Sequence, residues 1–495
     1  MLFNSIEFAI FLPIVFLLYW FVTKNQSKSQ NLLLLIASYF FYGFWDWRLL
    51  FLLAFLSLAN YLIGIRIDKK VSDNKTKVWF ILGLLVNLGV LITFKYYHFF
   101  IDGFIELIAL SGYDLPKSTT QIILPIGVSF YVFLSLSYII DIYKKNLSAN
   151  KNLIDVLLTF SFFPIILAGP IQRPVSLLPQ FAKKREFKYD QAAEGLKQIL
   201  WGLFVKVVIA DNLARYVNDF FLNYSTYSGS TLLLGIFFYA VQIYADFSGY
   251  SDMAIGIAKL FGINLMRNFA YPYFGRDITE FWKRWHISLT TWFRDYVFLP
   301  LSFAVAGRLK GEKVIGLKTD LFLYIFASTV VWSLTGLWHG ANYTFIVWGM
   351  IHGFFLIIYQ IQKKPRNKLF KRFGIKNDQR IVVFLESFVT LCIVLIAWVF
   401  FRAQNIEQAI NYLSIIFSPS LFSIPSFQGM RRALTIIIIV IAFFIIEWHG
   451  RDQQYAIANL GITWKRPYRY ALYYVLAFVI FWLTSSAQQF IYLQF

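Results

Sequence analysis

The chain consists mainly of long apolar runs separated by short polar loops. A helix needs about 20 apolar residues to cross the hydrocarbon core of a membrane. Runs of this kind lie at about 6–22, 31–44, 48–64, 78–97 and 121–141, with a shorter apolar segment at 99–110 and a last run near 470–485. The pattern predicts an all-α polytopic integral membrane protein with roughly 11 to 13 membrane segments.

Basic residues are concentrated in the loops between these runs. Cytoplasmic loops of membrane proteins carry an excess of Lys and Arg, so we expect the basic loops on the cytoplasmic side. Counting spans from these loops places both the N-terminus and the C-terminus outside. The loops concerned are those at 65–77, 144–151, 306–319 and 362–380, together with the short loop that contains Lys24 and Lys28.

One apolar stretch, Phe160 to Pro174, does not have the composition of a regular span. It contains three prolines and a glycine. Proline removes a backbone hydrogen-bond donor, and irregular backbone at membrane depth persists only where protein buries it or where it lines a wet cavity. The stretch therefore predicts a re-entrant or interfacial segment, with an ordinary loop as the alternative.

Composition agrees with the membrane assignment. The chain has 495 residues, of which 58% are hydrophobic and 15% charged, against roughly 45–50% and 25% in soluble proteins. We expect one integral domain over 1–495, with N-terminal spans at 1–150, a catalytic core at 151–360 and C-terminal spans at 361–495. The first apolar run has no basic residues before it and no cleavage site after it, so it is interpreted as a retained span.

The net charge of +20 would suggest nucleic-acid binding in a soluble protein. In a membrane protein, basic loops and contacts with anionic headgroups explain the same charge, and we expect no nucleic-acid partner. The single cysteine, Cys392, can form no disulfide within the chain. No paired His or Cys spacing suggests a metal site.

Polar chemistry is concentrated between residues 242 and 340. His286 and His339 lie there, 53 residues apart, and each directly follows a tryptophan, Trp285 or Trp338. His339 lies between two apolar runs, and a neutral imidazole can accept a proton from a hydroxyl group. A hydrogen-bonded packing histidine is the alternative for His339.

Around His286 the spacing of apolar residues predicts a tilted or interfacial helix. Phe281, Trp285, Leu289 and Trp292 form one stripe. Charged residues, among them Lys283, Arg284 and Arg294, fall mostly at the ends of the segment. Lys283 and Arg284 could steer an anionic donor, or they could simply extend to lipid headgroups.

Two carboxylates, Asp246 and Asp252, flank what the sequence suggests is a turn at Gly249. Either one could orient a histidine, or Ser248 or Ser251 could instead cap a helix that begins here. The remaining histidines are interpreted as structural: His98, His352 and His449.

These segments together resemble the membrane-bound O-acyltransferase family, and more closely its bacterial branch that includes alginate O-acetyltransferase. The likeness rests on the opening MLFNSIEFAIFLPIVFLLYW and on the blocks FFPIILAGPIQRP, YADFSGYSDMAIGIAKLFG, NFAYPYFGRDITEFWKRWHISLTTWFRDYVFLPL and GLWHGANYTFIVWGMIHG. It covers most of the chain, except that the last 100 or so residues match only in general hydrophobic character.

The resemblance implies a helical body with a central tunnel in a bacterial inner membrane. It places the near-invariant family histidine at His339 and a second one at His286. The charged and tryptophan residues named above would line the substrate route: Asp246, Asp252, Lys283, Arg284, Trp285, Arg294 and Trp338. The implied reaction carries an acetyl group from a cytoplasmic thioester to a cell-surface polysaccharide. Acetyl-CoA would be the donor substrate, with no bound cofactor, and a separate exported partner of the SGNH-hydrolase type would complete the transfer.

Three alternatives stay open. One is D-alanyl transfer from a carrier protein to teichoic acid, although the N-terminus is more similar to the alginate branch. Another is a polysaccharide transporter or flippase, whose signature would be paired broken helices in two repeated halves. The break at 168–174 has no clear counterpart in the second half of the chain. A lipid acyltransferase is the third.

Overall fold

The structure is a computed structural model that describes residues 1–23, 26–69, 73–113, 115–116, 122–309, 311–484, 488 and 490–491. Several predicted positions lie outside these ranges: Lys24, residues 70–72 and 310 of the basic loops, residues 121 and 485 of the apolar runs, and the C-terminal end at 492–495. Its contacts divide the chain into two compact units. Unit 1 comprises Met1–Leu203 and Tyr250–Met266, and unit 2 comprises Phe204–Gly249 and Arg267–Phe495.

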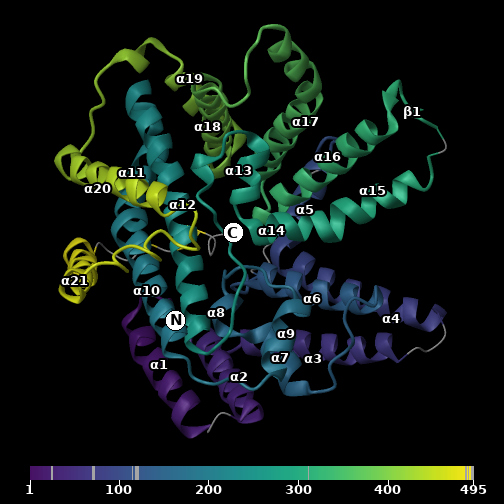
Figure 1. The fold of residues 1–495 in the computed structure, drawn as a ribbon. Coiled ribbons are helices and arrows are strands. Elements are labelled where there is room, and N and C mark those ends of the chain that lie inside the picture. Colours follow the sequence, from purple (N-terminus) through teal and green to yellow (C-terminus); the bar gives the residue numbers. More distant parts are fainter. Residues whose placement is uncertain are drawn as a thin grey trace. The chain divides into compact units, whose positions relative to one another are not determined.

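Unit 1 is built from helices (Figure 1). Within it α2 packs against α7, and α3 packs against α4 and α6. The elements are α1 (Ile6–Leu17), η1 (Leu18–Val22), α2 (Ser27–Gly43), α3 (Leu49–Asp68), α4 (Asp73–Leu91), η2 (Ile92–Tyr96), α5 (Tyr97–Ala109), α6 (Val128–Tyr143), α7 (Leu153–Ser161), α8 (Phe163–Ile166), α9 (Pro174–Ala182), α10 (Tyr189–Leu203) and the end of α12 (Gly229–Leu260).

Unit 2 is also helical, with one short hairpin of β1 (Lys313–Val314) and β2 (Leu317–Lys318) among its described residues. Its other elements are η3 (Phe204–Ala210), α11 (Asp211–Leu222), η4 (Tyr224–Thr226), most of α12, η5 (Pro272–Phe274), α13 (Ile278–Arg284), α14 (Ile287–Phe293), η6 (Arg294–Phe298), α15 (Leu299–Ala306), α16 (Thr319–His339), α17 (Tyr343–Arg372), α18 (Arg380–Arg402), α19 (Ile406–Ile416), η7 (Pro419–Phe422), α20 (Met430–His449) and α21 (Arg466–Leu483).

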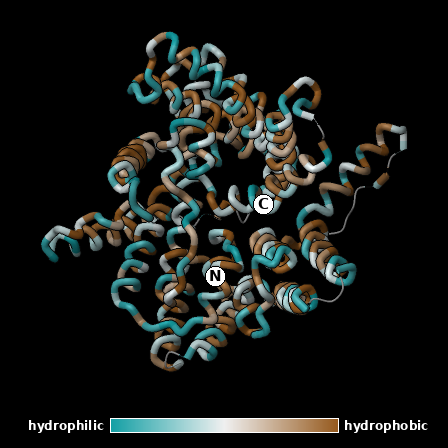
Figure 2. The backbone as a smooth tube through the Cα atoms, turned by 45° about the vertical axis from the view of Figure 1, so that its right-hand side comes forward, coloured by the Kyte–Doolittle hydropathy of each residue, from teal (hydrophilic) through white to brown (hydrophobic). Residues whose placement is uncertain are grey.

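Six of the described helical segments are long and apolar enough to cross a membrane. Hydrophobic stretches, drawn in brown, recur along the helices of the backbone (Figure 2). The six segments are Leu49–Asp68, Asp73–Ala109, Gly229–Leu260, Thr319–His339, Tyr343–Arg372 and Arg380–Arg402, with shorter apolar helices at Ile6–Val22, Val128–Tyr143 and Leu153–Ile166. These helices confirm the predicted all-α polytopic membrane protein. The predicted total of 11 to 13 segments stays a prediction.

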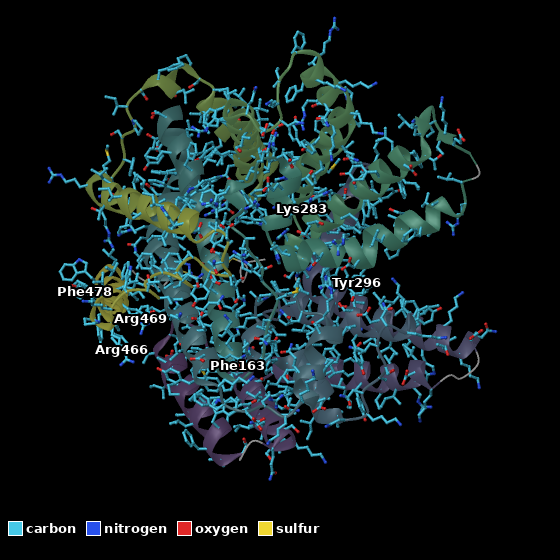
Figure 3. The ribbon with its side chains drawn as sticks, in the orientation of Figure 1. Phe163, Lys283, Tyr296, Arg466, Arg469 and Phe478 are labelled. Carbon is cyan, nitrogen blue, oxygen red and sulfur yellow. The ribbon has the colours of Figure 1, made fainter. Side chains whose placement is uncertain are left out.

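The last described helix, α21, covers the run predicted near 470–485 as far as Leu483. Arg466 and Arg469 lie near its start and Phe478 further along it (Figure 3). Phe478 and Trp482 are 63% and 75% exposed, as expected for side chains that contact lipid tails.

The proline-rich stretch after α7 has irregular backbone that is fully buried. Helix α7 ends at Ser161, α8 covers four residues, and no further helix begins until Pro174. Residues 160–172 are all buried. Burial of irregular backbone inside protein supports the predicted re-entrant or interfacial segment over an ordinary loop.

The predicted turn between Asp246 and Asp252 is wrong. Helix α12 runs unbroken from Gly229 to Leu260, so neither Ser248 nor Ser251 begins a helix. Gly249 lies inside this helix, because glycine in a buried helix can also permit close packing, as it does at Gly256 further along α12. A Cβ on Gly256 would meet the backbone oxygen of Gly195 at 2.6 Å.

Candidate active site

His339 is held where two helices of unit 2 cross closely. It is the last residue of α16, which packs side by side with α17 (Figure 1). Glycines make the close crossing possible: a Cβ on Gly336 would collide with the backbone oxygen of Phe345, and one on Gly349 with that of Trp332. His339 is 3% exposed, so its position is fixed by packing.

His286 lies at a sharp break between two short helices. Asp277 caps α13 by accepting hydrogen bonds from the backbone N–H groups of Thr279 and Glu280, both at 2.9 Å. The chain then leaves the helix at Trp285, and His286 adopts φ 42° and ψ 52° in the left-handed region before α14 begins. The single helix predicted here is therefore wrong, although its apolar stripe is buried as expected.

The break is anchored to an extended segment around Asn268. The backbone N–H of Ile287 donates to the Asn268 carbonyl at 2.9 Å, and that of Ala270 donates to the Arg284 carbonyl at 2.9 Å. The Asn268 side chain adds a contact with the His286 ring, whose Nδ1 lies 3.1 Å from Oδ1. No proline or glycine marks the break, so it has no local signal in the sequence.

The two histidines come together. The ring centroids of His286 and His339 are 6.4 Å apart, with the ring planes inclined at 65°. The Trp338 ring contacts both histidines, with ring-centroid distances of 5.9 Å to His286 and 4.9 Å to His339. Burial lowers the pKa of His286 to about 3, so this imidazole is neutral near pH 7.

Aromatic rings enclose the pair. The ring centroid of Phe247 lies 4.7 Å from that of His286. The ring centroids of Trp348 and Phe401 lie 4.8 Å and 5.1 Å from that of His339. Such surroundings exclude bulk water, which strengthens electrostatic interactions in the site.

A third histidine belongs to the same cluster. His352 is fully buried on α17, 5.0 Å from Trp348, and its Nδ1 accepts a hydrogen bond from the Trp282 indole N–H at 3.3 Å. The sequence placed His352 only 13 residues after His339, and that proximity was the one signal that could have drawn attention to it.

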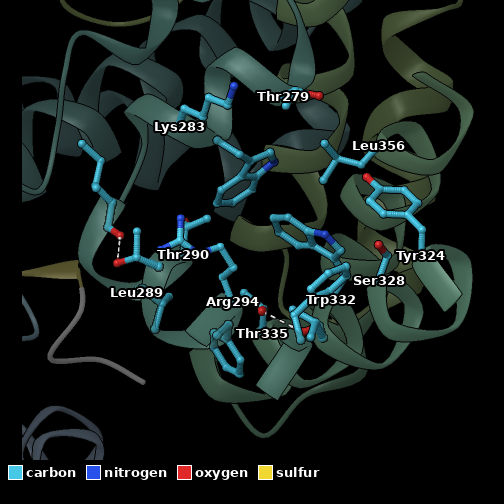
Figure 4. Close-up of a pocket in the computed structure, with 16 residues that line it drawn as sticks. Thr279, Lys283, Leu289, Thr290, Arg294, Tyr324, Ser328, Trp332, Thr335 and Leu356 are labelled. Atoms are coloured by element: carbon cyan, nitrogen blue, oxygen red, sulfur yellow. Dashed lines mark hydrogen bonds between the residues drawn. The ribbon is translucent and has the colours of Figure 1, made fainter. Parts of the chain in front are cut away.

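A cavity of about 550 Å³ opens next to this cluster (Figure 4). Trp282 and Trp332 form part of its wall, and Lys283 and Arg294 also line it. Thr335, one helical turn before His339 on α16, lies in the same lining. The cavity is therefore mostly apolar, with two basic side chains from the segment that carries His286.

Most of the other predicted site residues have specific partners. Arg284 pairs with Glu280, and Arg294 pairs with Asp295 at 2.8 Å. Asp246 is buried and pairs with Lys206 at 2.6 Å. Asp252 belongs to unit 1, where Gln198 donates to it at 2.7 Å. Trp285 is buried against Trp398, with ring centroids 5.0 Å apart.

Within the described ranges no group of three His, Cys, Asp or Glu side chains could hold a metal ion. The arrangement suits acyl transfer, because it offers two buried imidazoles in an aromatic site beside a cavity with basic residues.

Comparison with known proteins identifies the family. The model of the membrane-bound O-acyltransferase family matches residues 144–403. The chain is 39% identical to the probable alginate O-acetylase AlgI of Pseudomonas aeruginosa, over 94% of this chain and 84% of that protein. It is 34% identical to the peptidoglycan O-acetyltransferase of Helicobacter pylori, over 83% and 79% of the two chains.

A more distant relative is the teichoic acid D-alanyltransferase of Bacillus subtilis, which is 28% identical over 54% of this chain and 66% of its own length. The family match includes both candidate histidines and the helices that carry them. The chain belongs to the membrane-bound O-acyltransferase family and is a multi-pass membrane acyltransferase.

Proposed function

We propose that this protein is a membrane O-acetyltransferase that moves an acetyl group from a cytoplasmic thioester, acetyl-CoA, toward a polysaccharide outside the cell. The observation that carries the proposal is the buried His286–His339 pair, with ring centroids 6.4 Å apart beside an apolar cavity with basic residues. Similarity to proteins named for alginate and peptidoglycan O-acetylation supports the choice of group and acceptor.

His339 takes part directly in the transfer. Its imidazole acts as the base on the attacking hydroxyl or briefly holds the acyl group. Both roles require a ring with a fixed orientation, which the contacts with Trp338, Trp348 and Phe401 supply. Exclusion of water by these rings limits wasteful hydrolysis of the thioester.

The cavity is the route by which the donor approaches. Coenzyme A is anionic and cannot enter the hydrocarbon core, whereas a thin acyl-bearing arm can enter an apolar passage. Lys283 and Arg294 attract the anionic end, while Trp282, Trp332 and Thr335 accommodate the arm. Trp285, Trp338, Asp246 and Asp252 are further proposed residues of the route, and each is held by the contacts described above.

The protein would act in the bacterial inner membrane with both termini outside, and a separate exported partner of the SGNH-hydrolase type would pass the acetyl group to the polymer. The basic loops at 306–319 and 362–380 support the orientation, because they would face the cytoplasmic thioester. D-alanyl transfer from a carrier protein is the second candidate, supported by the D-alanyltransferase relative.

The test is thioester turnover by purified protein in nanodiscs. Wild type, His339→Ala and His449→Ala would each be incubated with radiolabelled acetyl-CoA, and free CoA would be followed. His449 is an exposed histidine of the same unit and serves as the control. We expect release from wild type and His449→Ala but not from His339→Ala. Equal release from all three would contradict the assignment of His339, and turnover only of a D-alanyl carrier protein would favour the second candidate.

A further inference from the structure

Asn268 makes an unusual set of contacts with the segment that follows His286. Its side-chain oxygen Oδ1 lies 3.1 Å from His286 Nδ1, 2.9 Å from the Ser288 hydroxyl oxygen and 3.3 Å from the Ser288 backbone nitrogen. Asn268, His286 and Ser288 are each fully buried. One atom therefore collects three polar contacts in a site where polar groups are expensive to leave unsatisfied.

These contacts determine which end of the amide faces the histidine. A backbone N–H can only donate, so the Ser288 nitrogen requires an acceptor opposite it. The atom of Asn268 at this position must be the oxygen, because the amide NH₂ group can only donate. The orientation of the amide thus follows from a donor whose chemistry is fixed.

The same logic determines the tautomer of His286. An oxygen acceptor opposite Nδ1 requires Nδ1 to carry the proton, and the neutral ring then has its lone pair on Nε2. Nδ1 is held by the hydrogen bond to Asn268, so Nε2 is the nitrogen that can take part in chemistry.

We propose that Asn268 is a positioning residue for the acyl transfer, which holds His286 as the neutral Nδ1–H tautomer and makes its Nε2 a proton acceptor. The inference rests on the proposed function for its consequence, though not for the tautomer itself. A neutral His286 with the opposite tautomer would be a hydrogen-bond donor that stabilises an oxyanion. With the lone pair on Nε2, His286 instead accepts a proton during the reaction.

Among the described residues, the His286 ring contacts the rings of Phe247, Phe269, Trp338 and His339, and of these four only His339 can titrate. Asn268 follows α12 in sequence and precedes α13, so it acts on the histidine from a different segment of the chain.

The direct test is ¹⁵N NMR of protein labelled at histidine, in nanodiscs near pH 7. The two ring nitrogens of a neutral histidine have different shifts according to which one is protonated, and the His286 signals are assigned by their loss in His286→Gln. We expect Nδ1–H in wild type and a changed shift pattern in Asn268→Ala. A wild-type His286 protonated at Nε2 would overturn the proposal. This measurement needs no catalytic activity, so it is independent of whether the proposed reaction is correct.

Steady-state kinetics of two Asn268 variants provide a second test. Asn268→Ala should lower kcat at least tenfold while the donor KM stays within about twofold. Asn268→Asp keeps the accepting oxygens and so preserves the local fold, but its negative charge favours the imidazolium form. In that variant the acidic limb of the kcat–pH profile should move to higher pH. A wild-type kcat and pH profile in both variants would overturn the proposal.

The matched control is Asn87→Ala. Asn87 is also a fully buried asparagine with amide hydrogen bonds, here to Asn60 and to the backbone of Gly83, but it lies in unit 1. Its replacement should lower thermal stability and leave kcat and the His286 shifts unchanged. A loss of kcat in Asn87→Ala equal to that in Asn268→Ala would show that the effect reports general destabilisation and would overturn the proposal.

Discussion

His286 and His339 come from segments 53 residues apart, yet their ring centroids lie 6.4 Å apart. Different structural features position the two rings. A close glycine-mediated helix crossing fixes His339, whereas a left-handed break anchored by Asn268 fixes His286. Two independent structural constraints therefore hold both rings at one buried position, and a fixed orientation of this kind is what the proposed catalytic roles need.

Replacement of His286 by alanine should therefore reduce turnover more than donor binding. Loss of a proton acceptor typically costs 10²–10⁴-fold in rate, so we expect kcat to fall by about 10²-fold or more. The cavity lining does not include His286, so the donor KM should change by less than about threefold. Steady-state CoA release over a range of acetyl-CoA concentrations separates the two parameters. A raised KM with an unchanged kcat would instead make His286 a recognition residue.

Lys283 provides a test of the donor route. It lines the cavity, and Lys283→Gln removes a positive charge with little change in size. We expect the KM for acetyl-CoA to rise about three- to tenfold, corresponding to roughly 1 kcal/mol, and to depend less steeply on salt. The kcat should be nearly unchanged.

Lys313→Gln is the matched control for Lys283→Gln. Lys313 is an exposed lysine of the same unit, in a loop predicted to lie on the same side of the membrane, and it does not line the cavity. Equal increases in KM for both variants would mean that general surface charge, and not this cavity, attracts the donor.

The sequence predicted the helical membrane body well and the shape of the site poorly. Apolar runs such as 6–22 and 48–64 predict helices because the requirement to satisfy the backbone in lipid leaves few alternatives. The family resemblance also predicts His286 and His339 as site residues. The helices and the two histidines can be predicted because they depend on local composition or on long sequence blocks, and both can be recognised in a single sequence.

The break before His286 depends on hydrogen bonds to a segment that is distant in sequence, which a local pattern of residues does not reveal. Residues 278–293 have helical periodicity, and the helix is interrupted because backbone groups at 284–288 bond with residues 268–270. Conversely, Gly249 suggested a turn in a helix that is continuous. Tertiary hydrogen bonds and packing override local preference in both cases, and the contacts of Asn268 likewise depend on the tertiary structure.

The stability of the protein should decline on mild acidification, partly through His286. Its pKa is about 3 in the folded protein and about 6.5 in an unfolded chain. The unfolded state therefore binds more protons as the pH falls below about 6.5, and the folded state loses stability progressively between pH 6.5 and 3. By pH 5 this one group accounts for roughly 2 kcal/mol.

Thermal unfolding at pH 7.5, 6 and 5 measures the effect. His286→Gln should show a smaller decrease in Tm between pH 7.5 and pH 5 than wild type, since the variant lacks the group that gains a proton on unfolding. His449→Gln, which alters an exposed histidine, should keep the wild-type decrease. If the His286→Gln and wild-type curves were parallel, a neutral buried His286 would be contradicted.

The crossing of α16 and α17 predicts that a single added methyl group will impair the site. A Cβ on Gly349 would collide with the Trp332 carbonyl. Gly349→Ala must then separate the helices or shift α16, and overpacking of this kind typically costs 1–3 kcal/mol. His339 ends α16, so a shift of this helix also moves the imidazole, and kcat should fall with Tm.

The control variant Gly89→Ala adds the same methyl group to α4, where nothing lies within 4 Å. There alanine should be neutral or stabilise the helix by up to about 1 kcal/mol. Wild-type Tm and kcat in Gly349→Ala would show that the crossing can relax and that its tightness does not position His339.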